Sequence, residues 1–282
     1  MSYKNINLTD HAKVIDTIDG NKSIAERLNA GAKKTVITIT DHETGKVKGI
    51  FENKIVISGS TFNAGEIFGV SPSVVLPNYN NEMNLDNTDD YTTTEPKNKS
   101  IVCLFCVDDS GCGATPNDVF VTKVTDRISP DTIMPFRYVD DTNDLNSDLR
   151  EMYFGRKHFE DEGKVAYYFK AFDTRPQLHL RYADGTQITD DVYNVETDQP
   201  AECYIETRLR ITRNDFREYF ENVLGWDKAR ISSISLCFAW YDDTIDDNKW
   251  YQQISPYTKL NFSFEWLVEL SKGIDFNYQI FY

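Results

Sequence analysis

Three of the five cysteines stand close together, as Cys103-x2-Cys106-x5-Cys112. Zinc is usually held by four converging ligands, commonly a Cys-x2-Cys pair and a second pair elsewhere. Cys103 and Cys106, however, fall within the apolar run Ile101–Val107, which predicts a buried strand. Side chains three positions apart in a strand point to opposite faces, and no second pair follows. The pattern therefore favours buried thiols, and we expect no metal ligand and no cofactor.

A second candidate for metal chemistry is Asp140-x-Thr142-x-Asp144, with Glu151 at the twelfth position. It partly matches an EF-hand loop, but Leu145 stands where the sharp turn needs glycine. Asp144 or Ser147 as a helix cap explains the same residues better.

Two further acidic runs, Asp86–Asp90 and Asp242–Asp247, lack the terminal glutamate of a calcium loop. Asp242, Asp243, Asp246 and Asp247 could still form a dispersed acidic site, so a metal-dependent enzyme is one alternative.

No catalytic constellation stands out in the sequence. The histidines are scattered, and Gly111-Cys-Gly113 has no third glycine before a helix. Phosphate-loop and Gly-x-Ser-x-Gly motifs are absent, although catalytic residues can converge from distant positions. We therefore expect a protein that is not an enzyme and has no catalytic residues. The histidines are His11, His42, His158 and His179.

Charge and composition narrow the classes of partner. The chain has 282 residues and a net charge of −15, from 45 acidic and 30 basic side chains. Phosphate backbones repel such a chain, so direct nucleic-acid binding is disfavoured. No apolar run could span a bilayer and Met1–Asp10 is polar, so we expect no membrane partner and no signal peptide. Sparse cysteines indicate reduced thiols and synthesis in a cytoplasm.

The clearest element pattern is strand, helix, strand over Ala201–Trp240. Ala201–Ile211 alternates with a period of two, and apolar residues recur at helical spacing over Phe216–Leu224. Gly225 is placed to end that helix, and Ile231–Trp240 returns as an apolar strand. This unit could be a parallel crossover, although three elements in sequence do not prove adjacent pairing.

Most other patterns predict strands, because aromatic and β-branched residues are frequent and alternate. Single strands are predicted at Ile101–Val107, Val119–Val124 and Lys164–Phe172. Hairpins are predicted for Thr35–Thr40 with Lys46–Ser58, Gln177–Tyr182 with Gln187–Val195, and Lys259–Leu270 with Ile274–Tyr282. Short helices are predicted at Ala64–Val70 and within Asp141–Phe154.

These elements predict an α+β fold that is strand-dominated, with antiparallel or mixed sheets and two or three short helices. We divide the chain into an N-terminal β-rich portion (1–76), a polar loop or arm (77–99), and a main α+β domain with a C-terminal β-hairpin (100–282). The arm is rich in Asn, Asp and Thr, which predicts an exposed segment.

The chain resembles the β-rich structural proteins of tailed bacteriophage particles. The resemblance lies in Thr38–Val47 with Ile55–Ser58, in Met152–Arg156 before Val165–Phe169, and in the aromatic C-terminal hairpin. It implies a non-enzymatic neck, collar, tail or baseplate component of the virion, made in the host cytoplasm. Its partners would be copies of itself, in a homo-oligomer, and neighbouring virion proteins. The arm 77–99 and the C-terminal hairpin would be the contact elements.

A third class is a binding module for carbohydrate or a cell surface. It depends on aromatic side chains exposed on strands, for which Tyr204 and Trp250 are the candidates.

Overall fold

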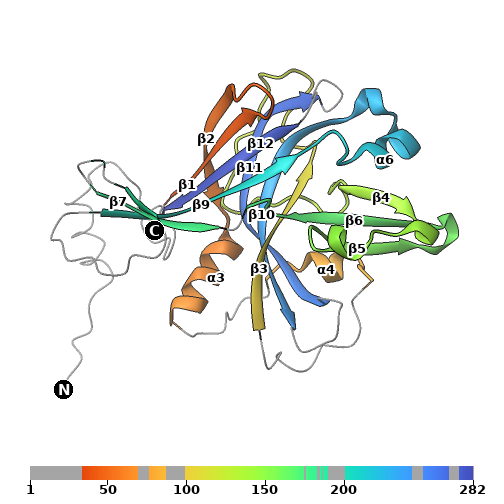
Figure 1. Cartoon of the computed structure of the whole chain (residues 1–282), viewed down its shortest axis with the longest axis horizontal. Helices are drawn as coiled ribbons and strands as arrows, with labels where there is room; N and C mark the ends of the chain where they lie inside the picture. Colours follow the sequence, from red (N-terminus) through yellow and green to blue (C-terminus); the bar gives the residue numbers. More distant parts are fainter. Residues whose placement is uncertain are drawn as a thin grey trace.

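The computed structural model describes residues 34–68, 76–86, 99–174, 176–182, 185, 187–189, 201–242, 250–266 and 273–281. Antiparallel strands dominate this part of the chain, and its helices are few and short (Figure 1). The strands are β1 (Lys34–Asp41), β2 (Val47–Ile55), β3 (Lys99–Asp108), β4 (Arg137–Asp140), β5 (Tyr153–Phe159), β6 (Lys164–Ala171), β7 (Gln177–Tyr182), β8 (Gln187–Thr189), β9 (Ala201–Ile211), β10 (Arg230–Asp242), β11 (Trp250–Trp266) and β12 (Ile274–Phe281).

Helical segments connect the strands or cover their ends. The α-helices are α3 (Ile57–Phe68), α4 (Tyr79–Glu82), α5 (Ser147–Arg150) and α6 (Arg217–Tyr219). Short 3-10 turns are η1 (Asp141–Asn143), η2 (Glu160–Glu162) and η4 (Trp226–Lys228), and η3 (Phe220–Leu224) is a π-turn. The strand-dominated, antiparallel character with few short helices confirms that part of the predicted fold class.

The strands form one curled sheet in the order β4-β6-β3-β10-β11-β2-β1-β12-β9-β7-β8, with β5 on the other edge of β6. β2 and β11 join at only two residue pairs, Ile55 with Thr258 and Lys54 with Lys259. The sheet therefore folds into two layers, β2-β1-β12-β9-β7-β8 and β4/β5-β6-β3-β10-β11. Their inner faces meet in one core, where the rings of Phe262 and Phe276 lie 5.7 Å apart.

β12 lies at the centre of its layer, and its alternation determines which of its side chains enter the core. Ile274, Phe276, Tyr278 and Ile280 all face the core, as the period of two predicts. Burying each such side chain contributes about 1.5–3 kcal/mol. The ring of Tyr278 reaches the opposite layer, with its centroid 4.9 Å from that of Phe105 on β3.

A second hydrophobic cluster covers the outer face of the β3–β10 layer. Tyr79, Met83 and Leu85 pack there against strand residues such as Leu104 and Phe169. Pro77–Asp86 is therefore not an exposed arm, and the prediction is wrong for these residues; residues 87–98 lie outside the described part. The polar composition misled because a few apolar side chains at suitable spacing suffice to bury a short segment.

The same segment protects the free edge of β5. The amide of Asp86 donates to the carbonyl of Arg156 (2.9 Å), and the amide of His158 donates to the Asp86 carboxylate (2.7 Å). Unpaired edges invite pairing with other chains, so this contact closes one such edge.

The predicted C-terminal hairpin is wrong in its pairing. Both strands form, but β11 lies between β10 and β2 while β12 lies between β1 and β9. Alternation determines which side chains face the core, but it does not determine which strand supplies the hydrogen bonds. The hairpins β1–β2 and β7–β8 do form, although Ile57 and Ser58 belong to α3 and not to the second strand. Residues 190–195 of the predicted strand after β7 lie outside the described part.

The parallel-crossover reading of Ala201–Trp240 is also wrong. β9 and β10 lie in different layers and every strand pair in the described residues is antiparallel. The helix predicted over Phe216–Leu224 does form, as α6 and the π-turn η3, but it begins one residue later because Phe216 has a left-handed backbone (φ 67°). Gly225 ends this turn with φ 92°, and its amide donates to the carbonyl of Phe220 (2.7 Å).

Three shorter predictions also change. The run Val119–Val124 forms a single bridge, between Val119 and Cys112, and is otherwise irregular. The helix predicted within Asp141–Phe154 is the single turn α5, and the helix predicted at Ala64–Val70 begins earlier, as α3. β1 and β2 share the sheet with the strands of 100–282, and the division into portions stays a prediction.

No helix among the described residues combines the length and apolarity needed to cross a membrane.

Candidate functional site

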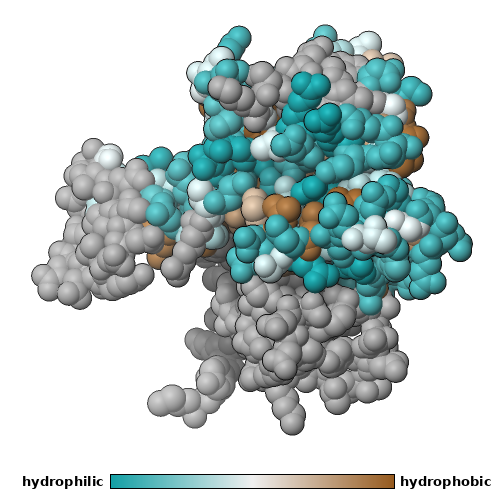
Figure 2. All heavy atoms as spheres, turned by 45° about the vertical axis from the view of Figure 1, so that its right-hand side comes forward, coloured by the Kyte–Doolittle hydropathy of each residue, from teal (hydrophilic) through white to brown (hydrophobic). Residues whose placement is uncertain are grey.

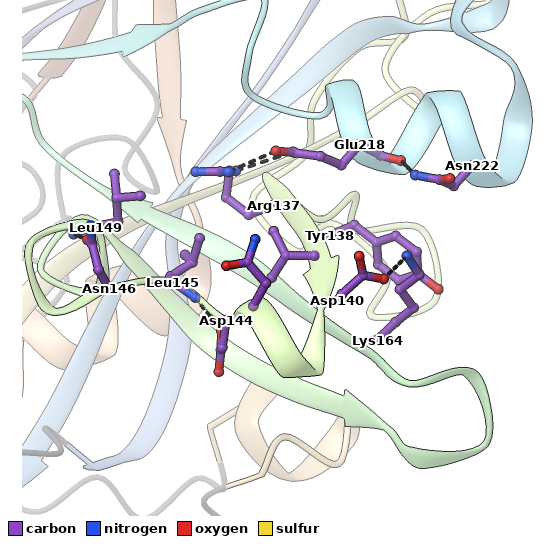
Figure 3. Close-up of a pocket in the computed structure, with 12 residues that line it drawn as sticks. Arg137, Tyr138, Asp140, Asp144, Leu145, Asn146, Leu149, Lys164, Glu218 and Asn222 are labelled. Atoms are coloured by element: carbon purple, nitrogen blue, oxygen red, sulfur yellow. Dashed lines mark hydrogen bonds and ion pairs between the residues drawn. The ribbon is translucent and has the colours of Figure 1, made fainter.

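A polar pocket of about 430 Å³ opens where β4 meets α5 and α6 (Figure 3). Its charged lining comes from β4, β6, α6 and the turn before α5, and three asparagine amides complete the polar rim. Val139, Leu145 and Leu149 supply apolar surface. The polar lining residues are Arg137, Tyr138, Asp140, Asn143, Asp144, Asn146, Lys164, Glu218 and Asn222.

Arg137 reaches from β4 to Glu218 on α6 (Figure 3). Its Nη2 and Nε donate to the two carboxylate oxygens of Glu218, at 2.8 and 3.2 Å. Burial alone would lower the pKa of Arg137, but these bonds outweigh it and raise that pKa. Asn222 Nδ2 donates to the backbone carbonyl of Glu218 (2.6 Å) and so helps to hold the backbone of the residue that carries the carboxylate.

The other charges of the lining are also paired. Lys164 Nζ lies 2.5 Å from Asp140 Oδ1 on the neighbouring strand. Asp144 accepts from the hydroxyl of Tyr167 (2.7 Å) and from Nε of Arg156 (3.0 Å). Burial would raise the pKa of Asp144, but the bonds from Tyr167, the Leu145 amide and Arg156 lower it overall.

A fully buried charge cluster lies behind the pocket. Lys170 Nζ on β6 donates to Asp215 Oδ2 (3.1 Å) and to the carbonyl of Arg210 (2.6 Å). Tyr153 donates its hydroxyl to Asp215 Oδ1 (2.7 Å), and Thr212 donates its amide and hydroxyl to Asp215 Oδ2 (2.8 and 3.0 Å). This carboxylate therefore links β5, β6 and the turn after β9.

The pocket and the buried cluster meet at one ring. The guanidinium of Arg137 lies 5.4 Å from the ring centroid of Tyr153, and Lys170 Nζ lies 5.6 Å from the same centroid. Burial, together with the Asp215 carboxylate, raises the pKa of the Tyr153 hydroxyl strongly. Tyr153 therefore stays protonated and acts as a hydrogen-bond donor.

What this arrangement can do chemically follows from its pairing. Each of the five charged side chains in the pocket lining has an oppositely charged partner within 4 Å. A general base or a nucleophile needs a group held ready for substrate, whereas these groups hold one another. The paired charges connect β4 to α6 and to β6.

The structure places Cys103 and Cys106 on opposite faces of β3, as their spacing predicts. Cys103 packs on the inner core and Cys106 lies in the outer cluster, with its sulfur 3.8 Å from that of Cys237. Burial raises the pKa of Cys103 to about 11 and raises that of Cys106 well above its usual value. Cys112 lies apart from both, with its thiol donating to the carbonyl of Thr115 (3.1 Å).

The predicted acidic and histidine candidates are dispersed. Asp140 and Asp144 bind basic partners and not one another, and Glu151 is exposed. His42 lies 3.1 Å from Asp275, and His158 lies 3.3 Å from Asp141. No group of three or more ligand-type side chains that could hold a metal occurs among the described residues.

Other candidates lie outside the described residues. These are His11, residues 87–90 of the first acidic run, residues 243–249, and the side chains of Asp242 and Trp250.

Tyr204 is not an exposed aromatic, so that basis for carbohydrate binding is wrong. Only 2% of it is accessible, because its ring stacks on His179 (5.0 Å) and on Phe281 (5.1 Å) across the neighbouring strands. Alternation correctly placed Tyr204 on the face of β9 opposite the core. That face is nevertheless covered, because the rings of His179 and Phe281 stack on Tyr204 there.

The most exposed large apolar side chain of the described residues, Val121, lies instead in Val119–Val124, which we call the apolar strap. Val121 is 84% exposed, Phe120 53% and Val124 54%, and the neighbouring Ile57 at the start of α3 is also exposed. In the view of Figure 2 most of the described surface is hydrophilic, and apolar residues form separate patches. Three successive exposed apolar residues, Val119–Val121, on such a surface are typical of an interaction site.

The apolar strap is held firmly, so its exposure is not the result of a loose loop. The amide of Phe120 donates to the carbonyl of Gly111 (2.9 Å), and Asn261 Nδ2 donates to the carbonyl of Phe120 (3.0 Å). At the other end, the amide of Ile57 donates to the carbonyl of Val124 (2.8 Å). The sequence pattern showed an apolar run here but gave no sign that it would face solvent.

Comparison of the chain with family models, curated proteins and solved structures yields no match.

Proposed function

We propose that this protein is a non-enzymatic structural component of a tailed bacteriophage particle, of the neck, collar, tail or baseplate type. It acts through protein–protein contacts with copies of itself and with neighbouring virion proteins. The observation that carries the assembly role is the apolar strap, a firmly anchored segment with Val121 84% exposed. The phage setting is supported by the sequence resemblance alone.

Two features support a role in contacts. Leaving apolar surface in water costs about 25 cal/mol per Å² relative to burying it, so a rigid exposed apolar segment gains from a partner. The charged pocket is consistent with the same role, because its side chains pair with one another and connect β4 to α6 and β6.

The test is the mass of the full chain in solution by light scattering over a wide concentration range, with negative-stain images of the same peak. We expect a defined oligomer, and Val121→Asp should reduce it because a charge would be buried in the contact. Val223→Asp is the matched control, since Val223 is 50% exposed on η3. A strict monomer at every concentration, unchanged by Val121→Asp, would overturn the assembly role.

A further inference from the structure

The backbone of the apolar strap has one edge in use and one edge open. Cys112 and Val119 form an antiparallel bridge, made by bonds from Phe120 to Gly111 and from Gly113 to Asp118. In such a bridge the N–H and C=O of Val119 point away from Cys112.

The backbone groups of Phe120 point to the other side from those of Val119. The N–H and the C=O of Phe120 are both engaged on the inner side, by Gly111 and Asn261. On the inference that the chain stays extended through Val121, the N–H and C=O of Val121 point outward like those of Val119, because the backbone groups of successive residues then point to alternate sides. Among the described residues, none bonds to the backbone of Val121.

An open edge of this kind accepts another extended chain by strand addition. We propose that its occupant is the same apolar strap of a second copy, paired antiparallel across a two-fold axis at Phe120. This inference rests on the proposed assembly role and names the partner of that surface.

The geometry makes the strap self-complementary. Val-Phe-Val reads the same in both directions, so each Val119 faces Val121 of the other copy and Phe120 faces Phe120. The outward groups of the two valines then form hydrogen-bonded pairs on either side of the axis, and the two phenylalanine rings share one face. Cross-strand aromatic pairs stabilise such contacts.

Charge opposes a contact between two copies least at this place. Each chain carries a net charge of −15, so two copies repel one another over most of their surface. Val119–Val124 contains no acidic residue and one lysine, Lys123. In the proposed register Lys123 lies opposite Asn117 and Asp118 opposite Thr122, so no like charges face one another.

A cysteine at the two-fold axis tests this register. Facing residues at a position without paired backbone bonds have Cα atoms about 4.5 Å apart, close enough for a disulfide. Phe120→Cys, incubated with oxidised glutathione as thiol oxidant, should give a covalent dimer on non-reducing gels. Val124→Cys is the matched control: Val124 is equally exposed (54%) but faces Pro116 in the other copy. The unaltered chain, treated identically, accounts for the native thiols.

Light scattering completes the test. Val121→Asp should raise the dimer dissociation constant about thirtyfold or more, and Val223→Asp should leave it unchanged. The strap pairing is overturned if Val121→Asp is as oligomeric as the unaltered chain. It is also overturned if Phe120→Cys cross-links no better than Val124→Cys. If the unaltered chain is oligomeric in either case, the assembly role then depends on another surface. If the unaltered chain is a monomer that Val121→Asp does not change, both are overturned.

Discussion

Two ion pairs with the same chemistry lie on either side of the Tyr153 ring, and they differ mainly in their access to water. Lys170 and Asp215 are fully buried, whereas Arg137 and Glu218 line an open pocket. Removing one partner of a buried pair leaves a charge that water cannot reach, while an exposed charge is solvated at once. Burial, more than distance, therefore decides how strongly the fold depends on each pair.

The sharpest way to test this comparison is Asp215→Ala. It leaves the Lys170 ammonium buried without its carboxylate, so we expect the free energy of unfolding to fall by about 3–5 kcal/mol. Urea denaturation measures the change. Glu221→Ala, which removes the exposed partner of Arg217, is the control. A loss for Asp215→Ala no larger than that of the control would contradict the buried-pair argument.

Replacing both Lys170 and Asp215 by apolar residues tests how much of the stability loss comes from the unpaired buried charge. In Lys170→Met with Asp215→Leu, no buried charge remains, so most of the loss caused by Asp215→Ala should be recovered. Recovery will be incomplete where Thr212 and Tyr153 lose their acceptor. The same denaturation experiment reports it, and a double variant as unstable as Asp215→Ala would show that the hydrogen bonds matter more than the charges.

Tyr153→Phe removes one hydrogen bond to Asp215 and leaves both charges in place. We expect a loss of about 1–3 kcal/mol, because one carboxylate oxygen becomes a buried acceptor without its donor. Thermal unfolding followed by circular dichroism is sufficient. No change in midpoint would mean that another donor replaces the hydroxyl.

On the pocket side, Glu218→Gln keeps the shape and removes the charge facing Arg137. The expected loss is about 0.5–1 kcal/mol, since both side chains retain contact with water. It should diminish further in high salt. If urea denaturation shows a loss as large as that of Asp215→Ala, the contrast between the two pairs would fail.

The smallest expected effect concerns pH. Burial would raise the pKa of Asp275, but bonds from Arg210 and His42 outweigh it and lower that pKa. A lowered folded-state pKa contributes stability above the unfolded value, about 3.9, and this contribution is lost as the pH falls through the folded value. Asp275→Asn should therefore unfold with a weaker pH dependence below about pH 4. Identical acid-unfolding curves would refute this.

The sequence predicted individual strands better than their partners. β1, β3, β6, β9 and β12 follow from alternation or continuous apolarity, because burial of one or both faces imprints these patterns. Pairing depends on contacts between distant segments, so the placement of β12 beside β1 was not predictable from either strand. The helical segment predicted after β9 forms as α6 and η3 and ends at Gly225 as predicted, but its left-handed start at Phe216 and its π-helical second half give no signal in residue type.

The site shows the same division. The spacing of Cys103 and Cys106 correctly placed them on opposite faces, because that argument needs only one strand. Lys170 and Asp215 gave no signal, since each stands in an ordinary context and they meet only through the fold. The apolar strap was visible as apolar, yet its exposure depends on where Gly111 and Asn261 hold it.

The position of β12 has a consequence for how the chain reaches its native state. Asn277 bonds to Thr38, 239 positions earlier in the sequence, and β12 separates β1 from β9. Until β12 has been synthesised, β1 and β9 each expose an unpaired edge. The core also lacks the four apolar side chains that β12 contributes to it. Contacts this distant in sequence slow folding and prolong the exposure of unpaired strands. We therefore expect refolding in a late, slow step, in which protection of the β1 and β9 amides from hydrogen exchange appears together with burial of Tyr278.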